Sequence, residues 1–230
     1  MSERRLVKVS GAEAIDYTEN SLRRLIIDGF YVSGERISDT ALSNELGVSR
    51  TTIREAFQRL VKEGLISIIP NRGAFVTKLS REEITKCYEV REALEVHAVR
   101  LATEKAPVER LLALQGMLTV TQTSIVEHGG RYPVDLDFHE KIFELADNPL
   151  LSEHASQVNA KLRLSRSKSG FMPARAREAY AEHVAILNAM LRRDVQGAVD
   201  AMRKHVTNSR INSEEREDSL NSTKQILLKR

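Results

Sequence analysis

The sequence predicts a mainly α protein with two domains: a small N-terminal domain of three helices and a β-hairpin, and a C-terminal all-α bundle of six helices. Apolar residues recur at helical spacing through most of the chain, whereas strand-like runs are confined to residues 65–76. A helix-capping signal near residue 80 separates the two patterns. At 230 residues the chain also exceeds one typical domain.

The N-terminal domain is expected over residues 10–78. An apolar stripe on residues 22–26 predicts a first helix that ends near Gly29. A short second helix is expected over residues 39–46 and should stop at Gly47, because a residue without Cβ suits a tight turn.

The third helix is expected over residues 50–63, with Ser49 as its N-cap. Its apolar residues share one face at i, i+3, i+4 and i+7, namely Ile53, Ala56, Phe57 and Leu60. Arg50, Thr51 and Arg54 then point outward from its first turns. In a helix-turn-helix protein this end of the second motif helix enters the major groove, where arginine can bond bidentately to guanine. The pattern therefore predicts DNA recognition.

A hairpin should follow the third helix. Residues 65–69 form a strand-like run, residues 70–73 contain strong turn formers, and residues 74–76 return as a second strand. The turn carries Arg72 and Gly73, so the hairpin is expected to be a wing whose glycine lets the backbone approach a groove that the arginine enters.

Charge alone does not identify a nucleic-acid partner, since the formal net charge is only +3. Residues 50–78 carry six basic and two acidic side chains, which fits either a solvated helix face or a DNA-binding surface. The position of this excess on the third helix and the hairpin favours DNA.

The C-terminal domain is expected over residues 80–212, starting with the capping box of Ser80 and Glu83. Its helices are predicted over residues 81–105, 107–127, 133–146, 149–167, 174–192 and 195–212. Several of them have proline near the first turn. Residues 213–230 are expected to form a polar, weakly packed tail.

A possible metal site lies in this second domain. Asp135 and His139 are four residues apart on one helix, so their side chains share a face. His183 and His205 stand at equal distances from Asp194 in the predicted turn between two antiparallel helices, which places both imidazoles at the same height. One carboxylate and three imidazoles suit Zn²⁺, Ni²⁺, Mn²⁺ or Fe²⁺. His97, His128 and His154 are expected to be ordinary surface or core residues.

The segment from Leu42 to Ala56, LSNELGVSRTTIREA, strongly resembles the operator-binding signature of the GntR family of transcriptional regulators. The Glu63-Gly64-Leu65 step and the Arg72-Gly73 wing continue the resemblance over roughly residues 20–77. The sequence departs from the family at Thr52 and at Ser33, where proline is usual. The resemblance implies DNA contacts by Ser49, Arg50, Thr51, Thr52, Arg54 and Gly73.

The second domain resembles the FCD effector domain of the FadR subfamily, and its six helices resemble the VanR-like branch. The resemblance rests on Asp135 to His139 with Phe138 included, on Asn148 to Leu151, and on the Glu182-His183 and Lys204-His205 pairs. It implies that Asp135, His139, His183 and His205 bind a metal. It also implies that Arg91 and Tyr88 face an effector pocket, although an exposed Arg91 paired with Glu95 is equally open.

These patterns predict a cytoplasmic transcriptional regulator, expected to be a repressor. It should bind a palindromic operator in double-stranded DNA as a homodimer and respond to a small carboxylate effector. No secretory signal or membrane span is expected, and Cys87 as the lone cysteine excludes an intramolecular disulfide.

Two other classes of function are compatible with parts of the sequence. A metal-dependent hydrolase could use the Asp/His site to activate water, but no recognisable motif supplies its general acid or base. An architectural DNA-binding protein would have no use for the ionisable cluster, which is unfavourable to bury unless it is paired or metal-bound.

Overall fold

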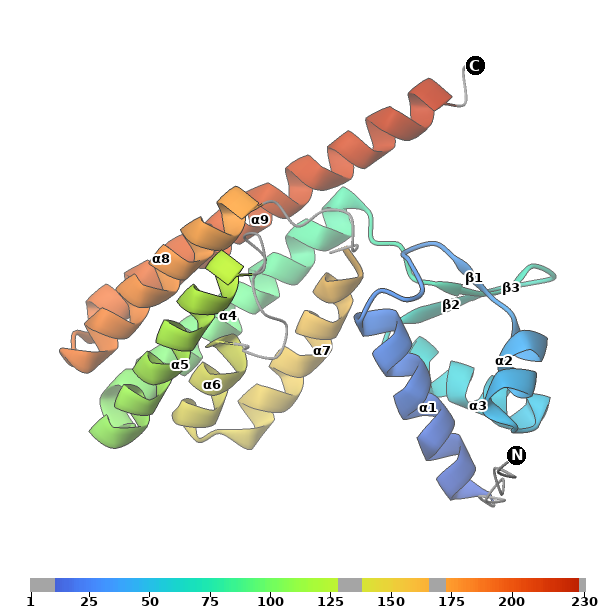
Figure 1. The fold of residues 1–230 in the computed structure, drawn as a ribbon, viewed down its shortest axis with the longest axis horizontal. Helices are drawn as coiled ribbons and strands as arrows, with labels where there is room; N and C mark the ends of the chain where they lie inside the picture. Colours follow the sequence, from blue (N-terminus) through green and yellow to red (C-terminus); the bar gives the residue numbers. More distant parts are fainter. Residues whose placement is uncertain (1–10, 128–137, 166–172, 228–230) are drawn as a thin grey trace. The chain divides into compact units, whose positions relative to one another are not determined.

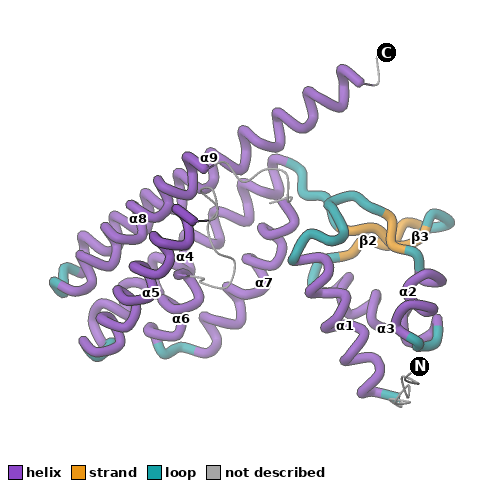
Figure 2. Tube along the Cα trace, viewed as in Figure 1, coloured by secondary structure: helices purple, strands orange, loops and turns teal. Residues whose placement is uncertain are grey.

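A computed structural model of the protein describes residues 11–127, 138–165 and 173–227 (Figure 1). The chain divides into two compact units, with the boundary at Leu79 and Ser80. Within the described ranges the strands all lie in the first unit, and the second unit is helical (Figure 2).

The first unit is the predicted winged helix-turn-helix domain. Its elements are α1 (Ala12–Ile27), β1 (Arg36–Ile37), α2 (Asp39–Leu46), α3 (Arg50–Lys62), β2 (Ile66–Ile69) and β3 (Gly73–Val76). The sheet order is β1-β3-β2, and both pairings are antiparallel. The two-residue strand β1 was not predicted, because so short a segment shows no alternation of apolar and polar residues.

Local signals place the recognition helix α3. Gly47 ends α2 in the left-handed conformation with φ of 66°, which glycine adopts without strain. The hydroxyl of Ser49 accepts a hydrogen bond from the backbone N–H of Thr52 at 3.1 Å and caps α3. Ile53 and Leu60 are fully buried, so the apolar stripe of α3 packs inward and its first turn faces out.

The described part of the second unit contains the six predicted helices. They are α4 (Arg81–Lys105), α5 (Val108–Glu127), α6 (Phe138–Ala146), α7 (Pro149–Ser165), α8 (Pro173–Leu191) and α9 (Val195–Leu227). Helix α4 packs against α6 and α9, while α8 packs against α5 and α9 (Figure 1). The capping box of Ser80 and Glu83 is present at the start of α4.

Helix α9 continues well beyond the predicted end at residue 212 and runs to Leu227. Polar contacts with α4 hold this extension: Glu214 accepts a hydrogen bond from the Thr85 hydroxyl at 2.8 Å and lies 3.7 Å from a guanidinium nitrogen of Arg81. Because these contacts are polar, apolar periodicity did not reveal the extension. Residues 213–227 of the expected polar, weakly packed tail thus continue helix α9, which contacts α4 at Glu214.

The turn between α8 and α9 is fixed to the end of α4. Arg193 has a positive φ of 57°, and its guanidinium donates hydrogen bonds to the carbonyls of Thr103 at 2.7 Å and Ala106 at 2.6 Å. These carbonyls belong to the last turn and the C-cap of α4, where intrahelical donors are missing. The contact sets the register of α8 and α9, and hence of His183 and His205.

Candidate functional sites

In the first unit, the predicted DNA-reading arginines share one acidic partner. The side chains of Arg50 and Arg54 are 55% and 64% exposed, and both guanidinium groups donate to Oδ2 of Asp39, at 3.0 and 3.1 Å. The hydrogen bond from Arg50, with that from Arg54, holds the pKa of Asp39 below its usual value. Asp39 thus aligns two arginines at the start of α3.

The small polar residues beside these arginines serve partly as a cap. Besides its bond to the backbone of Thr52, the Ser49 hydroxyl lies 2.9 Å from the Thr52 hydroxyl. Thr51 is exposed next to Arg50. All the predicted DNA-contacting residues of α3 therefore lie at its N-terminal end, and Ser49 and Thr52 also stabilise that end.

The wing has the predicted composition and one additional arginine. Arg72 is exposed at the tip, and its guanidinium lies 5.8 Å from the ring centre of Phe75. Gly73 has φ of +100°, and a Cβ there would lie 3.5 Å from Nε of Arg36. Arg36 from β1 thus joins Arg72 at the wing, and sequence analysis missed it together with β1.

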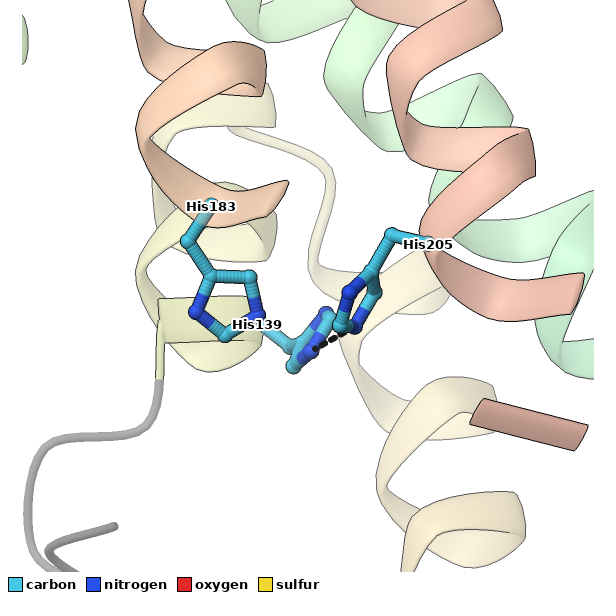
Figure 3. A group of neighbouring side chains, drawn as sticks. All are labelled: His139, His183 and His205. Atoms are coloured by element: carbon cyan, nitrogen blue, oxygen red, sulfur yellow. Dashed lines mark hydrogen bonds between the residues drawn. The ribbon is translucent and has the colours of Figure 1, made fainter. Parts of the chain in front are cut away.

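In the second unit, three predicted metal ligands meet between helices. His139 of α6, His183 of α8 and His205 of α9 each offer a ring nitrogen within 4.8 Å of the other two (Figure 3). His183 and His205 are buried, and the His139 side chain is 12% exposed. The ring of His183 stacks on Phe138 with centroids 4.3 Å apart.

Two carboxylates orient two of these imidazoles. Nδ1 of His139 lies 2.9 Å from Glu95 on α4, and Nδ1 of His205 lies 2.6 Å from Glu182 on α8. A carboxylate oxygen only accepts, so Nδ1 of a neutral His205 ring carries the proton and its Nε2 carries a lone pair. The two Nε2 atoms face each other at 3.2 Å.

Burial keeps two of the three imidazoles in their neutral form. Burial lowers the pKa of His205 to about 4, although its hydrogen bond to Glu182 acts in the opposite direction. Burial also lowers the pKa of His183, and the neighbouring imidazoles add to this effect. These rings are therefore neutral at pH 7. A neutral buried imidazole offers a lone pair that a divalent metal would accept.

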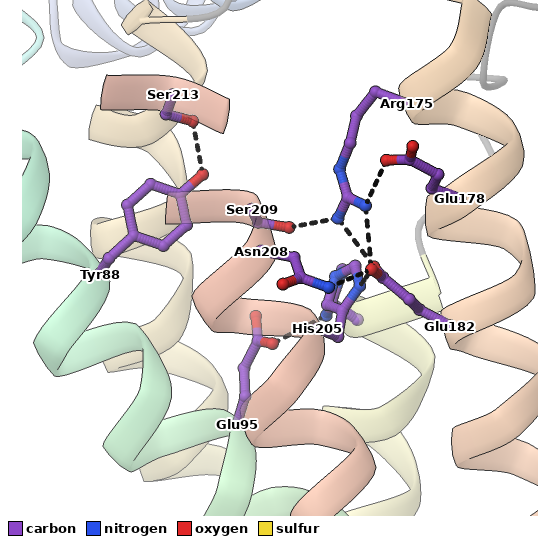
Figure 4. A network of polar contacts seen from close by, with 10 residues as sticks. Tyr88, Glu95, Arg175, Glu178, Glu182, His205, Asn208, Ser209 and Ser213 are labelled. Carbon is purple, nitrogen blue, oxygen red and sulfur yellow. Dashed lines mark hydrogen bonds and ion pairs between the residues drawn. The ribbon is translucent and has the colours of Figure 1, made fainter. Parts of the chain in front are cut away.

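A second polar layer surrounds Glu182 (Figure 4). Arg175 donates to both carboxylate oxygens of Glu182, at 3.0 and 2.7 Å, and also to the Ser209 hydroxyl at 3.1 Å. Asn208 adds a third donor at 2.6 Å. Burial raises the pKa of Glu182, but hydrogen bonds from His205, Arg175 and Asn208 outweigh it and lower the pKa to about 2. Glu182 is therefore ionised at pH 7 and accepts the hydrogen bond from Nδ1 of His205.

Arg91 was expected either to face an effector pocket or to be exposed and paired with Glu95. It does pair with Glu95, at 2.6 Å, but its side chain is only 3% exposed, so the expected exposure is wrong. Because the other oxygen of Glu95 contacts His139, Arg91 is one contact away from the histidine cluster. Tyr88 is buried beside Arg91, and its hydroxyl lies 2.8 Å from the Ser213 hydroxyl.

The remaining predicted residues divide into two groups. Asp135, the fourth predicted ligand, and His128 lie outside the described residues. His97 and His154 are exposed on α4 and α7, away from the cluster formed by the other three histidines, as expected for ordinary surface residues.

Both units match known sequence families. Residues 15–76 match the profile described as bacterial regulatory proteins of the gntR family. Residues 86–208 match the profile of the FCD domain. The chain belongs to the GntR family and carries an FCD domain.

Relatives of this GntR-family chain are transcriptional regulators. The HTH-type regulator YdhC of Bacillus subtilis is 29% identical over 191 residues, covering 81% of this chain and 84% of its own. The HTH-type transcriptional repressor RspR of Escherichia coli is 27% identical, covering 80% and 82%. The regulator is therefore a DNA-binding transcription factor and not an enzyme, and nothing favours the hydrolase alternative.

Solved structures share the fold of this GntR-family regulator. McbR/YncC of E. coli superposes with a TM-score of 0.75 at 23% identity, covering 89% of this chain and 99% of that one. A GntR regulator from Rhodococcus sp. RHA1 gives 0.70 at 24% identity, covering 89% and 97%. In the described part of the regulator, no helix is long and apolar enough to cross a membrane.

Sequence analysis missed several residues that support the histidines, namely Glu95 as an imidazole partner, Glu182, Arg175 and Asn208. Weak signals existed for two of them. Glu182 directly precedes His183, and Glu95 stands four residues after Arg91. Neither signal identifies which imidazole the carboxylate contacts, since both contacts join different helices.

Proposed function

We propose that this regulator is a cytoplasmic repressor that binds a palindromic operator as a homodimer and is controlled by a small carboxylate bound beside a divalent metal. The pair of Nε2 atoms of His139 and His205, each fixed by a carboxylate on its Nδ1, is the observation that carries the proposal. A carboxylate on the outer nitrogen is the usual support of a metal-binding histidine.

The metal would be held by His139, His183 and His205, with Asp135 as the proposed fourth ligand. Imidazole suits Zn²⁺, Ni²⁺ and Fe²⁺, and the carboxylate of Asp135 would also suit Mn²⁺. When bound, the metal would supply positive charge and coordination positions for an anion. Glu95 balances the charge of Arg91, so the metal would be the net positive charge that attracts an anion, and Arg91 is proposed to bind the effector through guanidinium hydrogen bonds.

The DNA part of the proposal rests on the exposed arginines of α3 and the wing. A dimer is proposed because two-fold proteins bind two-fold half-sites. Repression is supported by the relative RspR, which is named a transcriptional repressor. The effector would act by favouring one placement of the two reading heads over another.

Elemental analysis and thermal unfolding test the metal site. We expect about one divalent metal per chain, and a metal concentration 100-fold above Kd should stabilise the fold by about 2.7 kcal/mol. The double change His183→Ala with His205→Ala should remove both effects, whereas His154→Ala, on an exposed histidine, should change neither. Metal-free protein whose melting temperature is unchanged by Zn²⁺, Ni²⁺ or Mn²⁺ would refute the metal site.

A screen of small mono- and dicarboxylates on the operator complex tests the effector. We expect an active compound to weaken operator binding, and the response should fall in metal-stripped protein and in Arg91→Lys, which keeps the charge but loses the planar fork. Arg100→Lys on the same helix is the matched control. A response to neutral or cationic compounds only would contradict the proposal.

A further inference from the structure

Helix α5 has a surface whose composition is unusual for a solvent-facing helix. No charged residue stands between Arg110 and Glu127, although charged residues make up 29% of the chain. The inward side of this stretch is apolar apart from Thr121, as expected for a bundle helix. Its exposed side is uncharged as well and includes Leu112, Ala113, Gly116, Thr119, Val120 and Thr123, here called the α5 face. Helix faces in water normally carry charged residues.

Two large apolar side chains stand out on the α5 face. Leu112 is 50% exposed and Val120 is 59% exposed. Each is one helical turn from Gly116, so the three positions form one stripe along the helix. The stripe has a large apolar residue one turn to either side of the central glycine, so its pattern is approximately symmetric.

Nothing within the described chain explains the glycine at position 116. It lies in the middle of α5, and a Cβ added there would meet no atom within 4 Å. Its φ is not in the left-handed region that favours glycine. Glycine weakens a helix interior relative to alanine. A close approach by another molecule would explain why a side chain is missing here.

A second copy of the chain fits this stripe better than an unrelated partner. If a two-fold axis passes Gly116, an antiparallel α5 places Leu112 against Val120 of the other copy and Gly116 against its own equivalent. Such self-complementarity is what a two-fold contact demands. Since the α5 face has no charge, it presents nothing that repels its own copy.

The neighbouring helix also exposes small uncharged residues. Helix α8 packs along α5, and the Tyr180 hydroxyl donates to Gln122 at 3.2 Å. Ala181 and Ala185 are exposed on α8, and both are small. A stable interface buries at least about 1,200 Å² in total, which two adjacent helices supply more readily than one.

We propose that the α5 face is the surface on which a second copy of this chain docks, with the two α5 helices antiparallel about an axis at Gly116. The inference names the surface of the dimer contained in the proposed function, and it rests on that dimer. It adds the register in which the copies meet.

Sedimentation of the full chain tests the surface. The parent should be a dimer, and Val120→Arg should raise the dimer dissociation constant at least about 100-fold, because an arginine would be buried there without a partner. Leu150→Arg is the matched control, since Leu150 is 68% exposed on α7. It should remain dimeric. Circular dichroism and melting show whether each variant is folded.

Cysteine cross-linking tests the register in a Cys87→Ser background. A residue at the axis faces its own copy, so Gly116→Cys should form an inter-chain disulfide under mild oxidation. Leu112→Cys and Val120→Cys should each fail alone, and the double variant should cross-link. If Gly116→Cys does not fold, cross-linking of the double variant still tests the register.

The possible failures differ in what they overturn. The α5 face would be refuted if the parent is a dimer and the Val120→Arg variant is also a dimer. It would equally be refuted if the folded cysteine variants do not cross-link as stated. Either result would leave the proposed two-fold operator complex intact. A parent that is monomeric at all concentrations, alone and on operator DNA, would refute both the surface and the proposed dimer.

Discussion

Arginine–carboxylate pairs occur in both units of the regulator, and their surroundings decide what they do. At the start of α3, Arg50 and Arg54 are more than half exposed and share Asp39, whose side chain is 24% exposed. On α4, the side chains of Arg91 and Glu95 are 3% and 1% exposed. The same chemical pair is thus solvent-accessible in one unit and dry in the other.

The difference in exposure means that the arginines of α3 can exchange Asp39 for another partner, whereas Arg91 cannot exchange Glu95. Water screens the exposed pairs, which contribute about 0–1 kcal/mol, so phosphates or bases can replace Asp39 as partner of the arginines. A buried charge has no such replacement, and losing its partner is strongly unfavourable. The Arg91–Glu95 pair is therefore suited to holding His139 in one orientation.

The largest expected effect is on stability at the buried pair. Glu95→Ala should lower the free energy of unfolding by about 3–5 kcal/mol in urea, because it leaves Arg91 buried without its carboxylate. Replacing both partners, as Arg91→Met with Glu95→Leu, should lower it less than Glu95→Ala alone. A loss below about 1 kcal/mol for Glu95→Ala would remove the contrast between the two pairs.

The next effect concerns the second carboxylate. Glu182→Gln should weaken metal binding about 10–100-fold, as measured by competition with a chelator, because Nδ1 of His205 loses a charged acceptor. Glu178→Gln is the matched control on α8, since its side chain is 66% exposed and contacts Arg175 only at 3.5 Å. Equal metal affinity in the two variants would show that Glu182 does not support the site.

The exposed arginines should affect DNA binding with little effect on stability. Arg50→Ala or Arg54→Ala should weaken specific operator binding by about 1–3 kcal/mol if each reads a base edge. Arg59→Ala serves as the control, since Arg59 on the same helix pairs with Asp16 and Glu19. Parent-like binding of both variants to specific and random duplexes would show that the recognition helix is wrongly assigned.

The smallest effect is expected at Asp39. Asp39→Asn should change the free energy of unfolding by less than about 1 kcal/mol, because the pairs are exposed. It should tighten DNA binding less than about tenfold, since the arginines no longer leave a carboxylate to reach DNA. The gain should shrink at high salt. Weaker binding by Asp39→Asn would indicate that Asp39 positions the arginines on DNA.

Local sequence determined much of this protein. The signals were the caps at Ser49 and Ser80, the glycine stop at Gly47 and the apolar stripes. They placed α2 and α3 to within about one residue, and they did the same for the starts of the later helices that lie in the described ranges. The convergence of His183 and His205 also followed from sequence, because a tight helical turn relates heights on two adjacent helices. Such features depend on neighbours in the chain, which a pattern records directly.

Tertiary structure alone decided the partners of the histidines and the limits of two elements. Glu95 reaches His139 and Glu182 reaches His205 across helix boundaries, and only packing shows which carboxylate meets which ring. Strand β1 exists because β3 offers it hydrogen bonds, and α9 extends because α4 offers it polar partners. The burial of Arg91 belongs with these features. Contacts between residues far apart in sequence depend on how whole helices pack, and no local period encodes that packing.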